Sequence, residues 1–353
     1  MGQKLKVGII GTGSISAMHI EGYLKNPNVE LYAFCDINEA QLKKMAAKYG
    51  ITRTYTDCNE MLKLKELDAV SVCTWNSAHA PCTIAALNAG KHVLCEKPMA
   101  TSAAEAREML EAAKRNHKLL MIGFVRRYGN DCRIVKDFID KDFIGDIYYA
   151  KATYLRRNGN PGGWFGDKSR SAGGPLIDLG VHVIDLTRYL MGNPKPVSIY
   201  GVTYQKLFNR PHIKGAKGYT SISSGNHDIC DVEDFASAMI RYDNGAVLSI
   251  EASFSLNIKN DQGTIELFGD KAGVKLDPEV EFYTETNDYL TNISLDTSSA
   301  LSFDGLFNNE IDHYVDCIIN GTPCKSPAED GVTIMTILDG VYESARTGHE
   351  VLL

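Results

Sequence analysis

The stretch that decides the fold of the first part of the chain is Lys6-Val7-Gly8-Ile9-Ile10-Gly11-Thr12-Gly13-Ser14-Ile15-Ser16. A short apolar run of the β type leads directly into a glycine-rich turn, and a helical pattern follows. Gly11 permits a tight turn, and Gly13 lets the backbone approach a pyrophosphate at the helix N-terminus. Ser16 replaces the third glycine and is still small enough for close packing of helix and strand. The stretch therefore predicts a dinucleotide site made by Gly11, Thr12, Gly13, Ser14 and Ile15.

The second predicted strand, residues 29–34, ends in Cys35-Asp36-Ile37. An acidic residue placed roughly 20 residues after the glycines can accept hydrogen bonds from the adenosine ribose. A carboxylate there also repels a 2′-phosphate, so Asp36 favours NAD over NADP. The alternative is that Asp36 caps the N-terminus of a helix over residues 39–49. We favour ribose binding.

Strands and helices then alternate up to residue 124. Strands are expected over residues 67–73, 91–95 and 119–124, and helices over residues 80–89 and 103–116. This alternation is typical of right-handed βαβ units that build a parallel sheet. We therefore expect residues 1–124 to form a doubly wound Rossmann domain.

A second motif stands at the end of the strand over residues 91–95, where an apolar run stops in Glu96-Lys97-Pro98. Ligands bind outside the carboxyl ends of the strands in an open α/β sheet, so Lys97 is expected to project toward a ligand. The Lys97-Pro98 bond can be cis at low cost, which would place the ammonium through backbone geometry. The alternative is a solvated lysine at the end of a surface strand.

The pattern changes after residue 124, and residues 125–353 are expected to form an α+β domain for substrate binding and oligomerisation. Its β-type segments cover residues 147–157, 197–204, 235–242, 246–256, 263–268 and 274–277. Tight connections such as Asp243-Asn244-Gly245 predict antiparallel hairpins and a large, mostly antiparallel open sheet. Because only a helix or two remain to cover one face of this sheet, oligomerisation is expected. The terminal helices, residues 309–319 and 332–345, could pack back on the first domain.

One helix of this second domain carries a chemical cluster. It should run from Pro175 to about Met191, and it places Asp178 and His182 on one face because they are four residues apart. Asp185 falls near the same stripe. A histidine with a carboxylate one turn earlier can serve as a general base. The alternative is a core histidine in an ordinary helix ion pair.

Composition excludes some classes of function. The net charge of −7 argues against nucleic acid or an acidic membrane as a general partner, and no apolar run is long enough to span a bilayer. The nine cysteines are scattered without a C-x-x-C pair, which is typical of reduced thiols in a cytoplasmic protein. We expect no metal site.

In these motifs the chain resembles the glucose–fructose oxidoreductase/inositol dehydrogenase (Gfo/Idh/MocA) family over nearly its whole length. The resemblance is carried by Gly11-Thr12-Gly13, Asp36, Thr74-x-Asn76-x-x-His79, Gly90-Lys91-His92-Val93-x-Cys95-Glu96-Lys97-Pro98 and Gly173-Gly174-x-x-x-Asp178-x-Gly180-x-His182-x-x-Asp185. The segment from Gly123 to Tyr128 is further similar to the inositol dehydrogenase branch. The resemblance implies a Rossmann domain, a C-terminal domain with an open sheet, and homodimers or homotetramers packed through that sheet.

The resemblance also implies an NAD-dependent dehydrogenase that acts on a secondary alcohol of a sugar, glycoside or cyclitol. The implied catalytic residues are Lys97, Asp178 and His182. The cofactor residues expected besides the glycine turn are Asp36, Ile37, Thr74, Trp75, Asn76, His79, Glu96 and Lys97. Because sugar rings favour aromatic stacking and bidentate donors, the substrate contacts are expected from Arg127, Tyr154, Arg156 and Trp164, together with Asp178 and His182.

The chain departs from the family pattern at two positions. Ser16 replaces the third glycine or alanine, and Trp75 stands where many members have proline. Trp75 puts the nicotinamide-side contacts of its turn in doubt. Two other functions remain open. One is a redox-neutral enzyme that retains NAD and cleaves glycosides by oxidation, elimination and reduction. The other is an NAD-sensing protein without catalysis.

Overall fold

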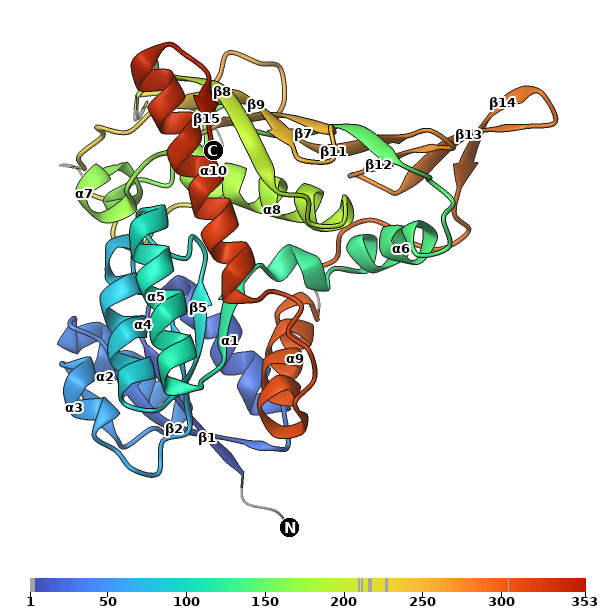
Figure 1. The fold of residues 1–353 in the computed structure, drawn as a ribbon. Coiled ribbons are helices and arrows are strands. Elements are labelled where there is room, and N and C mark those ends of the chain that lie inside the picture. The colour runs from blue at the N-terminus through green and yellow to red at the C-terminus, as the bar shows by residue number, and fades with distance from the viewer. Residues whose placement is uncertain (1–3, 209, 211, 215–217, 226–227, 304) are drawn as a thin grey trace. The chain divides into compact units, whose positions relative to one another are not determined.

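The structure is a computed structural model, and it describes residues 4–208, 210, 212–214, 218–225, 228–303 and 305–353 (Figure 1). The chain forms two compact units. The first combines the residues up to Val125 with a later segment that ends at Met335. The second combines Arg126–Phe303 with Thr336–Leu353. None of the helices in the described residues is long and apolar enough to cross a membrane.

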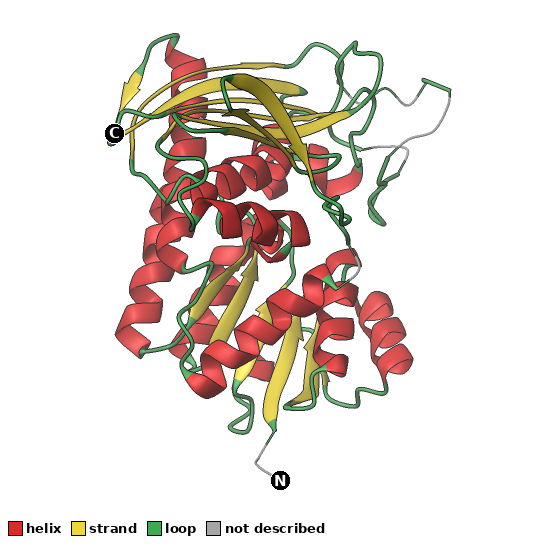
Figure 2. Cartoon of the chain, turned by 90° about the vertical axis from the view of Figure 1, so that its right-hand side faces the viewer, coloured by secondary structure: helices red, strands yellow, loops and turns green. Residues whose placement is uncertain are grey.

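The first unit is built on a six-stranded sheet with the order β3-β2-β1-β4-β5-β6, in which every pairing is parallel. Its strands are β1 (Leu5–Ile10), β2 (Val29–Cys35), β3 (Thr54–Tyr55), β4 (Ala69–Val72), β5 (His92–Glu96) and β6 (Leu120–Gly123). Its helices before β6 are α1 (Ser14–Lys25), α2 (Glu39–Tyr49), α3 (Cys58–Leu62), α4 (His79–Asn88) and α5 (Ala103–Asn116). Helices flank the sheet in Figure 2. The order and direction of the strands confirm the predicted Rossmann fold.

The register of the three central strands brings their carboxyl ends into line. Ile10 of β1 pairs with Val72 of β4, and Val72 pairs with Cys95 of β5. β4 is buried along its whole length, as expected for a central strand of a parallel sheet with both faces covered. The residues that follow these strands therefore meet at one edge of the sheet.

The first unit is not a single stretch of sequence, because α9 (Leu306–Asn320) returns to it. A side chain at Gly22 of α1 would come within 2.8 Å of Ile311 of α9, so this glycine permits the close approach of the two helices. Beyond α9, the amide of Ile122 donates a hydrogen bond to the carbonyl of Ser326 at 2.9 Å. α10 (Ala328–Thr347) then begins in the first unit and ends in the second.

The second unit is built on a nine-stranded sheet with the order β14-β13-β12-β11-β7-β10-β9-β8-β15. Only the pairing of β7 with β10 is parallel, so the predicted mostly antiparallel open sheet is confirmed. Its strands are β7 (Ile147–Leu155), β8 (Pro196–Tyr204), β9 (Phe235–Tyr242), β10 (Val247–Ser253), β11 (Gln262–Gly269), β12 (Gly273–Leu276), β13 (Glu281–Thr286), β14 (Tyr289–Ser294) and β15 (Val351–Leu352). α6 (Asn130–Ile139), α7 (Lys168–Ser171) and α8 (Val181–Leu190) precede or interrupt the strands.

The two faces of this large sheet differ in polarity and burial. One face carries small and aliphatic side chains such as Ala152 and Ile250, which are fully buried. On the other face, Tyr200 and Met239 pair across β8 and β9 and remain about half exposed, at 52% and 54%. Tyr204 follows on the same face at 47%. This second face thus presents exposed aromatic and apolar side chains beside charged ones such as Lys151 and Arg241, and the described chain leaves it partly open.

Candidate functional site

The glycine turn of the first unit has the geometry that a dinucleotide needs. Gly11 has a φ of +88°, and a Cβ there would lie 2.7 Å from the carbonyl oxygen of Cys73. A Cβ at Gly13 would instead meet no atom within 4 Å. Gly13 is the N-cap residue of α1, and no side chain caps this end of the helix. Because the amides of a helix N-terminus attract anions, this open surface fits the pyrophosphate of a dinucleotide.

Asp36 lies beside this turn at the end of β2. Its Oδ2 accepts hydrogen bonds from the amide of Thr12 at 2.6 Å and from the Thr12 hydroxyl at 2.8 Å. The N-cap of α2 is Asn38, whose side chain accepts from the amide of Gln41. The alternative interpretation of Asp36 as that N-cap is therefore wrong. The neighbouring Ile37 is 70% exposed.

The Glu96-Lys97-Pro98 turn follows β5, and its Lys97-Pro98 bond is cis. Glu96 is buried, and its Oε1 lies 2.8 Å from Nε2 of His19. Its Oε2 accepts from the backbone amide of Lys97 at 3.1 Å. Burial acts to raise the pKa of Glu96, but the hydrogen bond and charge of His19 outweigh it and lower the pKa. The side chain of Glu96 thus holds the backbone from which the partly accessible Lys97 projects.

His79 connects two of the turns at this edge. Its Nδ1 lies 2.7 Å from the carbonyl oxygen of Pro98, and its Nε2 lies 3.1 Å from that of Thr74. Burial lowers the pKa of His79, and a neutral imidazole donates to only one of two carbonyls. His79 is buried, so it braces these turns from within. Asn76 is buried beside it, while Thr74 and Trp75 keep partial exposure.

The helix that carries the second cluster starts differently from the prediction. Residues Leu176–Gly180 form a π-helix and only Val181–Leu190 is an α-helix, so the expected single α-helix is corrected. A π-helical turn widens the spacing of its side chains, and such turns are frequent at functional sites. Between residues 173 and 190, only Asp178, His182 and Tyr189 are not buried. Asp178 and His182 thus share the accessible stripe of an otherwise buried helix.

Glu233 supports the start of this helix, and the sequence analysis missed it. Its carboxylate accepts hydrogen bonds from the amides of Gly174 at 2.9 Å and Leu176 at 3.2 Å, and from the Tyr342 hydroxyl at 3.0 Å. Burial raises the pKa of Glu233. These contacts fix the turn that leads to Asp178. No sequence signal could have found Glu233, because it comes from a segment distant in the chain.

Arg127 and Asp185 form a buried ion pair. Asp185 accepts from Nε of Arg127 at 3.0 Å and from Nη2 at 2.6 Å. Both side chains are at most 1% exposed, and the guanidinium also lies 4.7 Å from the Tyr189 ring. Removing one partner of such a pair typically costs about 3–5 kcal/mol. The sequence predicts that Arg127 contacts the substrate, whereas in the structure its guanidinium is buried in a structural ion pair with Asp185.

The other predicted substrate residues keep partial exposure in the second unit. The guanidinium of Arg156 lies 5.4 Å from the Tyr154 ring and donates to the carbonyl of Gly159 at 3.0 Å. Trp164 stacks on Phe165, with ring centroids 4.0 Å apart. Stacked aromatic faces of this kind offer surfaces that a sugar ring can contact.

A buried carboxyl group lies behind the Glu96 turn. Glu310 of α9 is fully buried, and neither of its oxygens has a hydrogen-bond partner among the described residues. Burial, together with the negative charge of Glu96, raises the pKa of Glu310 well above its ordinary value. We infer that Glu310 is a neutral carboxylic acid in the folded chain.

Replacing Glu310 with glutamine should stabilise the fold increasingly as the pH rises. A carboxyl group whose pKa is higher in the folded chain than in the unfolded chain contributes its full stability below the unfolded-state pKa, about 4.3 for glutamate. As the pH rises from there toward the folded-state pKa, the unfolded chain loses its proton first, and the wild-type protein loses this stability. The E310Q variant does not ionise at this position. The difference between its free energy of unfolding and that of wild type should therefore grow by up to about 1.4 kcal/mol per pH unit in this window. Urea unfolding at several pH values measures it. The exposed Glu108→Gln is the control, and parallel pH profiles for wild type and E310Q would contradict a neutral Glu310.

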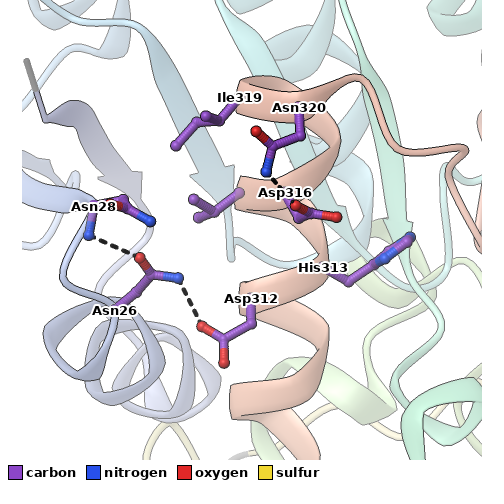
Figure 3. A pocket seen from close by; sticks show the side chains of 8 residues that line it. Asn26, Asn28, Asp312, His313, Asp316, Ile319 and Asn320 are labelled. Atoms are coloured by element: carbon purple, nitrogen blue, oxygen red, sulfur yellow. Dashed lines mark hydrogen bonds between the residues drawn. The ribbon is translucent and has the colours of Figure 1, made fainter. Parts of the chain in front are cut away.

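One pocket of the first unit lies elsewhere. It has a volume of about 390 Å³ and lies beside α9, where Asn26 and Asn28 face Asp312 (Figure 3). The side chain of Asn26 donates to Asp312 at 2.7 Å. None of the predicted site residues lines this pocket, so it is not the candidate functional site.

The parallel sheet, the glycine turn and Asp36 define a dinucleotide-binding domain. The chain belongs to the Gfo/Idh/MocA oxidoreductase family: residues 5–124 match the model of the oxidoreductase family with an NAD-binding Rossmann fold, and residues 132–275 match the GFO/IDH/MocA C-terminal domain. The resemblance seen in the sequence is therefore confirmed.

Individual relatives agree with this assignment. The chain is 34% identical to D-glucoside 3-dehydrogenase of Escherichia coli over 99% of this chain and 97% of the relative. It is 28% identical to myo-inositol 2-dehydrogenase of Thermotoga maritima over 93% and 92%. Among solved structures, levoglucosan dehydrogenase in complex with NADH and L-sorbose superposes with a TM-score of 0.86 at 25% identity, covering 99% of both chains.

Proposed function

We propose that the protein is an NAD-dependent dehydrogenase that oxidises a ring hydroxyl of a sugar, glycoside or cyclitol, with D-glucosides as the first substrates to test. The observation that supports the proposal most strongly is that a few ionisable side chains of each unit remain partly exposed to solvent. Lys97 follows β5 at the edge of the sheet where the glycine turn lies, and Asp178 and His182 share the accessible stripe of a buried helix. The identity to a D-glucoside 3-dehydrogenase supports the choice of substrate class.

The residues of the first unit fit NAD. Gly13 offers an open surface at an uncapped helix N-terminus, and Asp36 places a carboxylate beside it. We assign ribose binding to Asp36, pyrophosphate binding to the turn Gly11–Ile15, and the nicotinamide end to Thr74, Trp75 and Asn76. Ile37 would flank the adenine. His79 and Glu96 would act by holding these turns. When bound, NAD accepts the hydride.

The chain's own groups then have distinct roles. His182 accepts the proton of the substrate hydroxyl as the C–H bond breaks. The Lys97 ammonium stabilises the negative charge that develops on the alcohol oxygen. Asp178 orients His182 or the ammonium. Tyr154, Arg156 and Trp164 contact the sugar ring.

Two glycine variants separate the fold of the turn from its binding of NAD. Gly13→Ala should leave stability within about 0.5 kcal/mol of wild type, because a Cβ there meets no atom. It should weaken NAD binding at least about tenfold, since the methyl group would occupy the surface to which we assign the pyrophosphate. Gly11→Ala should destabilise the chain by about 2 kcal/mol or more, because its φ is positive and its Cβ meets backbone. Urea unfolding and NAD titration by fluorescence measure both, and tight NAD binding by G13A would contradict the assignment.

A screen of substrates tests the function itself. Methyl glucosides, free sugars, levoglucosan and myo-inositol are incubated with NAD or NADP, and NADH or NADPH formation is followed by absorbance. We expect turnover with at least one ring alcohol, and faster with NAD because Asp36 repels a 2′-phosphate. Release of free sugar without accumulation of NADH would instead support the redox-neutral enzyme. NAD binding without any turnover would support a non-catalytic NAD sensor.

We further propose that copies of the chain assemble through the open face of the large sheet. That face exposes Tyr200, Tyr204 and Met239 in one patch, and apolar patches of this kind mark interaction sites. Analytical ultracentrifugation should find dimers or tetramers. A monomer at micromolar concentration would contradict this assembly.

A further inference from the structure

A cluster of one histidine and two cysteines lies where α9 ends and the connection to α10 begins. His313 and Cys317 are one turn apart on α9, and Cys324 follows shortly after Gly321. Each of the three residues offers one ligand atom, and these atoms all lie within 4.8 Å of one another. Nε2 of His313 lies 3.4 Å from Sγ of Cys317. Nothing in the proposed catalysis uses these side chains.

The spacing of these atoms is close to that of a tetrahedral zinc site. With Zn–S bonds of about 2.3 Å and Zn–N bonds of about 2.0–2.1 Å, tetrahedral angles place sulfur and nitrogen about 3.6 Å apart and two sulfurs about 3.8 Å apart. The distance of 3.4 Å between His313 and Cys317 is already near this value. The remaining distances, which are at most 4.8 Å, would have to shorten by no more than about 1 Å for the three atoms to surround an ion.

The local backbone holds Cys324 against α9. Gly321 ends the helix with a φ of +71°. Asp316 then accepts hydrogen bonds from Thr322, and from the side chain of Asn320 at 2.6 Å. The connection that carries Cys324 is thus fastened to the last turn of the helix.

The hydrogen bonding of His313 is also compatible with metal binding. The amide of Lys325 donates to Nε2 of His313 at 3.0 Å. Nε2 therefore carries a lone pair, and it is this lone pair that a metal ion binds. An ion would replace the Lys325 amide at Nε2. His313 extends from α9 away from Asn26 and Asn28 (Figure 3), and it is partly accessible, as are both cysteines.

We propose that His313, Cys317 and Cys324 bind a divalent transition-metal ion of the zinc class, with water as the fourth ligand. Two thiolates and an imidazole select borderline and soft ions over Mg²⁺ or Ca²⁺. The bound ion would fasten the C-terminal turn of α9 to the connection that leads to α10. Because the ion binds the folded chain, it stabilises the fold in proportion to its concentration relative to Kd. This site is independent of the proposed dehydrogenase activity.

The test is a Co²⁺ titration of the full-length, fully reduced protein, followed by Zn²⁺ competition and thermal unfolding. We expect one equivalent of Co²⁺ to produce a cobalt–thiolate charge-transfer band, Zn²⁺ to abolish that band, and Zn²⁺ to raise Tm. Cys317→Ser and Cys324→Ser should each eliminate the band. The matched control is Cys58→Ser, which removes a similarly exposed cysteine from α3 and should leave the band unchanged.

Several results would overturn the proposal. These are the absence of a band in the wild-type protein, a band that survives both cysteine substitutions, and a Cys317–Cys324 disulfide that persists after reduction. Circular dichroism shows whether each cysteine variant is folded. If one of the two variants misfolds, the other still tests the proposal. His313→Asn should weaken Co²⁺ binding at least about tenfold, and unchanged affinity in H313N would exclude the histidine as a ligand.

Discussion

Replacing Lys97 with alanine should lower kcat by about 10²- to 10³-fold while NAD binding stays close to that of wild type. The ammonium is assigned to the negative charge that develops on the alcohol oxygen, and removing one such donor commonly has an effect of this size. The backbone at Lys97 is held by Glu96 and does not depend on the lysine side chain. Steady-state kinetics and NAD titration measure the two effects separately.

Two further variants sharpen this prediction. Lys97→Arg keeps the positive charge but not the compact ammonium, and it should recover only part of the activity because the two groups are not interchangeable at a fitted site. Lys44→Ala removes an exposed lysine from α2 and should leave the kinetics unchanged. A K97A variant with near-normal turnover would show that the role assigned to Lys97 is wrong.

Replacing His182 with asparagine should lower kcat/KM by about 10²- to 10⁴-fold, which is the usual contribution of a general base. In the wild-type enzyme, protonation of this base should reduce kcat/KM on the acidic side of the pH profile. The variant has no such group, so that part of its profile should become flat. Kinetics across the pH range of stability measure both the size and the shape of the effect.

Asp178→Asn serves as the comparison for His182. Asp178 is assigned to orientation, so its loss should lower the rate but leave the acidic fall of the pH profile in place. If H182N keeps that fall and D178N loses it, the carboxylate is the base and the assignment to His182 is wrong.

The parts of the fold that the sequence predicted depend on local physical requirements. The turn after β1 needs glycine at a positive φ, and a run of apolar residues between turn signals marks each buried strand. The helix over residues 175–191 was predicted from its terminal residues and its apolar stripe. Its first turn is π-helical, and no pattern distinguishes this because the same side chains suit either helix.

The residues that the sequence did not reveal act through tertiary contacts. Glu233 caps a turn far from it in the chain, and Arg127 finds its partner in Asp185 on another helix. Glu310 looks like any polar residue of an amphipathic helix, and only packing shows that it is buried without a hydrogen-bond partner in the part of the chain that the structure describes. The hairpin of β13 and β14 was also missed, because polar residues interrupt its short apolar runs and only Phe282 of its two strands is buried.

The cluster of His313, Cys317 and Cys324, for which we propose metal binding, was also not predictable from the sequence. His313 and Cys317 share a helix face at a spacing visible in the sequence, but Cys324 joins them only through the turn at Gly321. The spacing lacks a C-x-x-C pair, so the sequence alone predicted no metal site.

The central claim of the proposed function is that Lys97 and His182 act on the same alcohol in one step. A double-mutant cycle, measured by single-turnover kinetics, tests this claim. The substrate is the ring alcohol that the enzyme is found to oxidise, used both unlabelled and deuterated at the reacting carbon. Residues that act as one unit have strongly non-additive effects. We predict that the K97A/H182N variant transfers deuterium to NAD at a rate within about threefold of the slower single variant. Losses that multiply in the double variant would contradict the account.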